Sequence, residues 1–188
     1  MSSNEVLKAV QTKAGKIAGL PKPASDEDVR RAEAFLGFPL HPLHARVLLE
    51  VADGGLVPWM YGVSHHGVRD KNRGLVEMRE YLGGENGRNL PAFTVPLADL
   101  GCGAWLLVET RTGRVLGVDA SGIIETEHTL ERWLGDWAAG RDVVKEMFDS
   151  ALATHHIGKN PFTKRPMVFN SRGPLKGRRL SSWPRESG

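Results

Sequence analysis

The chain has 188 residues, of which 40% are hydrophobic and 25% charged, and its formal net charge is +3. These values fit a soluble globular protein with room for one hydrophobic core, and no apolar run approaches the roughly 18 residues of a membrane-spanning helix. The single cysteine excludes an internal disulfide, and the first ten residues lack the apolar stretch of a secretory signal, so we expect a cytoplasmic protein.

The charge is unevenly distributed along the chain. Residues 157–188 contain eight lysines and arginines and one acidic residue, a charge of +7, which leaves −4 for residues 1–156. We divide the chain into an N-terminal helix and linker (1–24), a domain (25–156) and a basic C-terminal tail (157–188). Because prolines and glycines interrupt the tail, we expect it to contact the domain up to about residue 170 and to be disordered beyond that point.

The spacing of apolar residues predicts four helices in the first half of the chain. The expected helices are residues 4–19, which form only a weak amphipathic pattern, and residues 25–37, 42–53 and 75–82. The second begins at Ser25, a favourable N-cap, and stops at Gly37. Its apolar face consists of Val29, Ala32, Phe35 and Leu36.

Strand patterns dominate the middle of the chain. The expected strands are residues 94–100, 104–110 and 114–119, with a short fourth strand at 123–124. Gly113 suits a left-handed position in the turn between the second and third strands. Helices are expected again at 130–138 and 142–152. The sequence therefore predicts a single α+β domain, a mostly antiparallel sheet of about four to six strands flanked by N- and C-terminal helices.

Several segments in this order resemble the SMI1/KNR4 (SUKH) superfamily. They are LGFPLHPLHARVLLEVADGG (36–55), VPLADLGCG (95–103), GRVLGVD (113–119) and LERWLGDWAAG (130–140), and the tail's NPFT (160–163) is similar to endings of bacterial members. The resemblance implies a binding protein without catalytic residues. Bacterial members are predominantly immunity proteins that neutralise a cognate toxin by covering it, and fungal relatives are scaffolds. We accordingly expect a protein partner, no enzymatic activity, no metal and no cofactor.

One stretch is a candidate partner-binding surface. Trp59, Met60 and Tyr61 follow a helix stop and precede a polar loop, where exposed aromatic side chains are favoured interface anchors. The loop would add a polar rim of His65, His66, Arg69 and Asp70. A mildly acidic face could dock on a basic toxin, and its candidate contributors are Asp53, Asp70, Glu77, Glu80 and Glu85.

Two other functions stay open. The cations of the tail could bind nucleic acid or another anion through salt-sensitive phosphate contacts. Alternatively, the histidines could serve a small metal-dependent hydrolase, with His41 and His44 three residues apart, although no HExxH pattern or second cysteine accompanies them. Cys102, between two glycines, fits a small buried hydrophobe better than a nucleophile.

Overall fold

The computed structural model places most of the chain. It describes residues 1–57, 59–63, 74–84, 90–101, 103–149, 153–159, 166–171 and 173–180. The helices are α1 (Ser3–Ala14), α2 (Asp26–Leu36), α3 (Pro42–Glu50), α4 (Leu75–Gly83), α5 (Leu130–Ala138) and α6 (Val143–Glu146). The strands are β1 (Thr94–Gly101), β2 (Ala104–Glu109), β3 (Arg114–Asp119), β4 (Gly122–Thr129), β5 (Ala153–Lys159), β6 (Pro166–Ser171) and β7 (Arg178–Leu180).

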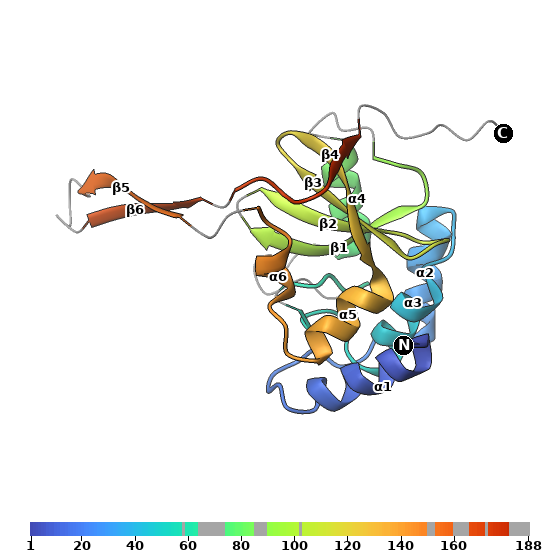
Figure 1. Ribbon diagram of the computed structural model, residues 1–188. Coiled ribbons are helices and arrows are strands. Elements are labelled where there is room, and N and C mark those ends of the chain that lie inside the picture. Colours follow the sequence, from blue (N-terminus) through green and yellow to red (C-terminus); the bar gives the residue numbers. More distant parts are fainter. Residues whose placement is uncertain are drawn as a thin grey trace.

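Five of these strands form one antiparallel sheet in the order β1-β2-β3-β4-β7. Helix α4 packs against β1, while α1, α3 and α5 contact one another beside the sheet (Figure 1). The predicted α+β domain, with an antiparallel sheet flanked by helices from both ends of the chain, is confirmed. Among the helices of the described residues, none has the length and hydropathy that a bilayer crossing requires.

The hairpin β2–β3 lies in the middle of the sheet. Val108 pairs with Val115 and Trp105 with Val118, and nine of the twelve residues of the two strands are buried. Strands covered on both faces carry continuous apolar runs instead of an alternating pattern. Gly113 closes the hairpin with φ of 71°, as the sequence predicts.

The N-terminal helix belongs to the same hydrophobic core as the sheet. Ser2 and Glu5 form a capping box that starts α1, and Val6, Leu7 and Val10 are buried in the core. Lys13 lies 4.7 Å from the centre of the Trp137 ring, so a cation–π contact adds to the packing of α1 on α5. The helix ends at Ala14 instead of residue 19. Its apolar face is buried, although its amphipathic pattern in the sequence is weak.

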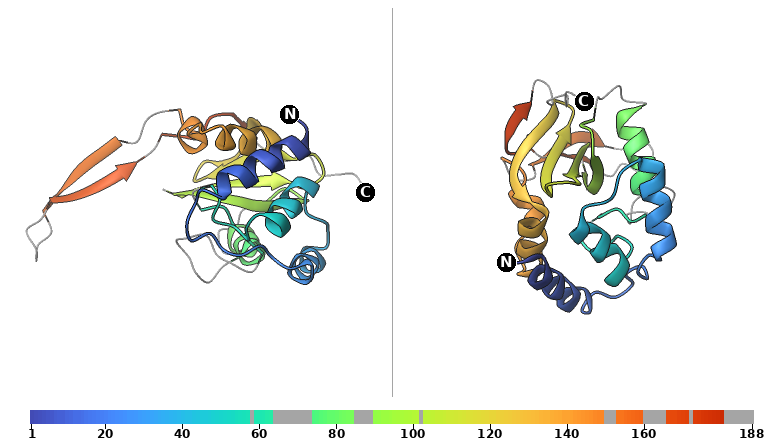
Figure 2. Two further views of the ribbon diagram at one scale, coloured as in Figure 1. Left: turned by 90° about the horizontal axis from the view of Figure 1, so that it is seen from below. Right: turned by 90° about the vertical axis from the view of Figure 1, so that its right-hand side faces the viewer.

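The end of the domain differs from the predicted helix 142–152. Helix α6 stops at Glu146, because the backbone at Phe148 forms a bridge with Leu175 instead of a further helical turn. Residues 153–159 and 166–171 pair as the separate hairpin β5–β6. Two views show this hairpin projecting away from the body of the molecule (Figures 1 and 2).

Residues 173–180, which we name the C-terminal latch, return to the domain. The backbone amide of Asp149 donates to the Pro174 carbonyl at 3.0 Å, and that of Lys176 donates to the Met147 carbonyl at 2.8 Å. Leu175 is buried over Gly117, where an added Cβ would lie 2.7 Å from the Leu175 Cδ1 atom. The expectation of disorder beyond residue 170 is therefore wrong for these eight residues, because buried apolar contacts and strand pairing hold them.

Candidate partner-binding site

The loop after α3 is folded by two glycines and a buried carboxylate. Gly54 and Gly55 have φ of 88° and 74°, and the amide of Gly55 donates to the Met60 carbonyl at 2.8 Å. The Asp53 Oδ1 atom accepts a hydrogen bond of 2.6 Å from the amide of Val63. Asp53 is itself buried, so it positions this loop and contributes nothing to an acidic surface, contrary to the expectation from sequence.

The segment 59–61 lies along the edge of β1. The Tyr61 amide donates to the Leu97 carbonyl at 3.0 Å, and Met60 forms a β-bridge with Ala98. Edge pairing turns these side chains into the core, where Met60 is 0% and Tyr61 4% exposed. The expectation that both are exposed interface anchors is therefore wrong, and only Trp59 of the three is half-exposed.

The remaining predicted site residues divide into two groups. His65, His66, Arg69, Asp70 and Glu85 lie outside the described residues, as does Cys102. Glu77 and Glu80 are exposed on α4. Whether any of them contacts a partner stays a prediction.

Glu77 and Glu80 border a groove between α2 and α4, which we name the α2–α4 groove. These helices lie next to each other on one side of the molecule (Figure 2). The cavity measures about 350 Å³ and is lined by the apolar residues Ala32, Phe35, Val63 and Val76 and by the charged residues Asp28, Arg31, Glu77 and Glu80. Phe35 is 64% exposed, an unusual state for so large an apolar side chain.

The rim of the groove is acidic. Asp28 is held in the capping box of α2, where the Ser25 hydroxyl donates to its Oδ2 atom at 2.6 Å. Arg31 is paired with Glu27 at 3.0 Å, so its charge is partly neutralised outside the groove. Glu77 accepts from the Gly74 amide at 2.9 Å. Three carboxylates against one arginine leave a negative charge around an apolar floor.

Sequence reasoning missed Phe35 as a surface residue. It lies on the stripe with Val29 and Ala32, both buried, but packing of α2 leaves the Phe35 side of the stripe uncovered. An apolar stripe that is too wide for the packing elements to cover predicts that one of its residues is exposed. Which residue is exposed depends on the positions of α3 and α4.

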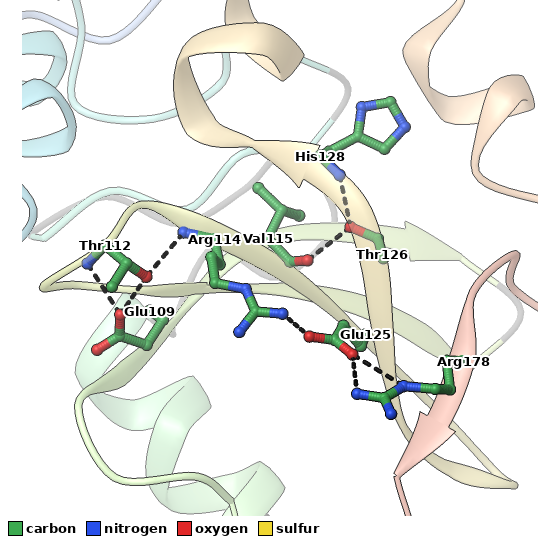
Figure 3. A network of polar contacts seen from close by, with 8 residues as sticks. All are labelled: Glu109, Thr112, Arg114, Val115, Glu125, Thr126, His128 and Arg178. Atoms are coloured by element: carbon green, nitrogen blue, oxygen red, sulfur yellow. Dashed lines mark hydrogen bonds and ion pairs between the residues drawn. The ribbon is translucent and has the colours of Figure 1, made fainter.

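A second polar cluster joins the latch to the sheet (Figure 3). Glu125 on β4 is paired with Arg114 on β3 and accepts from the Nε atom of Arg178 on β7 at 3.0 Å. On the same strand, the Thr126 hydroxyl donates to the Val115 carbonyl at 2.6 Å and accepts from the His128 amide at 3.2 Å. The contacts connect neighbouring strands, so the role they support is structural.

At the other end of this network, Glu109 organises the β2–β3 turn. It accepts from the Thr112 amide at 2.8 Å and from the Arg111 Nε atom at 3.1 Å. Burial raises the pKa of Glu109, but the hydrogen bonds from Thr112 and Arg111 outweigh burial and hold that pKa below its ordinary value.

Removing the Glu125 carboxylate should loosen the latch. We expect Glu125→Gln to lower the free energy of unfolding by about 1 kcal/mol, because two arginines lose their shared partner. Amide hydrogen exchange of β7 should accelerate more than that of β2. Glu127→Gln, an exposed position two residues along β4, is the matched control. Equal exchange in both variants would contradict a role for Glu125 in holding the latch.

The three histidines whose side chains the structure describes, His41, His44 and His128, form no metal site with one another. His44 is fully buried on α3, and neither of its ring nitrogens is hydrogen-bonded to any residue that the structure describes. Burial, with a smaller contribution from the charge of His41, lowers the pKa of His44 to about 4. The Nε2 atom of His41 lies 3.9 Å from Glu131, and His128 is on β4. Across the described residues, no three histidine, cysteine or acidic side chains are placed to share a metal.

Comparison with known proteins leaves the family open. No protein-family model, no curated protein and no solved structure matches the chain.

Proposed function

We propose that this chain is a non-enzymatic, cytoplasmic protein-binding module of the SMI1/KNR4 kind, an immunity protein that neutralises a cognate bacterial toxin by direct binding. The observation that carries the proposal is the α2–α4 groove, in which the exposed ring of Phe35 lies beside three carboxylates. Exposed aromatic side chains inside a polar rim are typical of the centres of protein interfaces.

The charge of the groove supports a basic partner. Enzymes that attack nucleic acid bind phosphate through lysines and arginines, so an acidic inhibitor is complementary to their active-site faces. Electrostatic attraction of this kind accelerates association and is weakened by salt. The charge of −4 over residues 1–156 acts in the same direction as the rim of Asp28, Glu77 and Glu80.

Two observations weigh against the alternatives. In the basic tail, Arg178 is exposed and paired with Glu125, so one of the tail's cations is engaged in an ion pair with the sheet. For a metal-dependent hydrolase, His44 would have to reach a ligand at the surface, and it is fully buried. Binding of nucleic acid by the tail and hydrolysis by the histidines therefore remain the weaker proposals.

Co-expression tests the proposal. If a gene next to this one encodes a secreted protein with a variable C-terminal domain, that domain is the toxin candidate, and it is expressed in cells with and without this chain. We expect the chain to restore growth and to co-purify with the toxin domain in a fixed stoichiometry. A chain that lacks residues 181–188, which follow the latch, should protect equally. Failure of toxin-expressing cells to grow when the full chain is expressed in soluble form would contradict the proposal.

A further inference from the structure

Elsewhere in the chain an arginine stacks on an aromatic ring and bonds a carboxylate, and, among the described residues, the α2–α4 groove has the ring and the carboxylates without the arginine. At the β2–β3 turn, the guanidinium of Arg111 lies 4.2 Å from the centre of the Phe93 ring and also bonds the Glu109 carboxylate at 3.1 Å. Arg79 lies 5.5 Å from the centre of the Phe38 ring. Arginine suits such places because its planar cation stacks on an aromatic ring while its N–H groups bond a carboxylate.

The groove presents the ring and the carboxylates of this arrangement. Phe35 is exposed, and Glu77 and Glu80 lie on the facing helix. Within the described residues, no cation stacks on Phe35, because the nearby Arg31 is directed to Glu27 and Asp28. Glu80 has no side-chain hydrogen bond or ion pair to any described residue.

We propose that the α2–α4 groove binds an arginine side chain of the partner, with the guanidinium stacked on Phe35 and hydrogen-bonded to Glu80. This assignment rests on the proposed function for the identity of the partner, a basic toxin surface. The chemistry of recognition rests on the groove alone. The apolar floor of Ala32, Val63 and Val76 would contact the aliphatic stem of the arginine.

Peptide binding tests the recognition without the toxin. The probes are two short peptides of identical length, one alternating leucine with arginine and the other alternating leucine with lysine, titrated against the full chain and followed by nuclear magnetic resonance. We expect the arginine peptide to bind several-fold more tightly and to shift the amides of α2 and α4. Equal affinity for the two peptides, or shifts confined to other elements, would overturn the proposal.

Variants separate stacking from simple apolar contact. Phe35→Leu keeps apolar area but removes the ring, and it should weaken binding of the arginine peptide about fivefold, whereas Phe35→Tyr should retain it. Glu80→Gln should weaken binding about threefold. Ile17→Ala, at another exposed apolar residue, and Glu127→Gln are matched controls with no expected effect. Unchanged affinity in Phe35→Leu would overturn the stacked geometry.

The same variants distinguish this inference from the proposed function. A chain that protects cells against the toxin domain, and still does so as the double variant Phe35→Leu with Glu80→Gln, would leave the function intact and contradict the groove. A chain that binds the arginine peptide through Phe35 but neither binds nor inhibits the toxin domain would support the groove and contradict the immunity function.

Discussion

Replacing Gly54 by alanine should lower the free energy of unfolding by about 3 kcal/mol, the combined scale of a left-handed non-glycine residue and a steric overlap in a packed region. Gly54 has φ of 88°, and an added Cβ would lie 2.8 Å from both the Gly62 nitrogen and the Met60 oxygen. These are backbone atoms, so no side-chain rotation relieves the overlap. Urea denaturation at neutral pH measures the loss.

Gly37 offers a matched control for this substitution. It ends α2 with φ of 79°, but an added Cβ would meet no atom within 4 Å. Gly37→Ala should therefore cost only about 1 kcal/mol, the conformational part alone. Similar losses in the two variants would show that the loop 52–63 yields to the added methyl group and that its contacts with Met60 and Gly62 are not tightly fixed.

Replacing His44 by methionine should remove a pH dependence of stability. The pKa of His44 in the folded chain is about 4, below the ordinary 6.5, because burial disfavours its charged form. The unfolded chain therefore takes up the proton first as the pH falls. The contribution of neutral His44 to the free energy of unfolding is fully present above pH 6.5 and decreases between pH 6.5 and 4. Below pH 4 the total loss is about 3 kcal/mol.

Urea denaturation at pH 7, 5.5 and 4.5 compares wild type and His44→Met. We expect the variant to gain stability relative to wild type at each lower pH, since methionine fills the buried site without a titrating group. His128→Gln is the control. Burial also lowers the pKa of His128, but the side chain is only half-buried, so we expect a smaller gain in stability at low pH than in His44→Met. Parallel losses in wild type and His44→Met would contradict a neutral, buried His44.

Local patterns account for the middle of the chain. Strands β1 to β3 match the expected segments within one residue at each end, because glycines and polar turn residues punctuate short apolar runs. Helix α5 was equally predictable from the spacing of Trp133, Leu134 and Trp137. Strands β1 to β3 pair with strands that are adjacent in the sequence, and the apolar face of α5 is visible in its own residue spacing.

The C-terminal region is the opposite case. Strand β7 exists because Arg178 and Leu180 pair with β4, more than fifty residues earlier in the chain, at Glu125 and Ile123. Its three residues show no strand pattern of their own, and two of them are arginines, which are usually exposed to solvent. Contacts of this range are decided by the completed sheet, which no local periodicity describes.

Only part of the candidate site could be predicted from the sequence, because the burial of its other residues depends on contacts between distant segments. Glu77 and Glu80 could be assigned to the acidic face from their polarity on a helix. Met60 and Tyr61 could not be placed in the core, because the edge of β1 that covers them is formed later in the chain. Phe35 could not be placed outside it, because its exposure depends on how closely α4 approaches α2.

Isothermal titration calorimetry of the full chain with the purified domain of the toxin candidate, with that domain's enzymatic rate recorded on the same samples, tests the central claim most directly. We expect saturable 1:1 binding that weakens with salt, and a toxin rate that falls in proportion to complex formed. A toxin that keeps its full rate at saturating concentrations of the chain would contradict binding as the mechanism, as would turnover of any substrate by the chain alone that a single polar substitution abolishes.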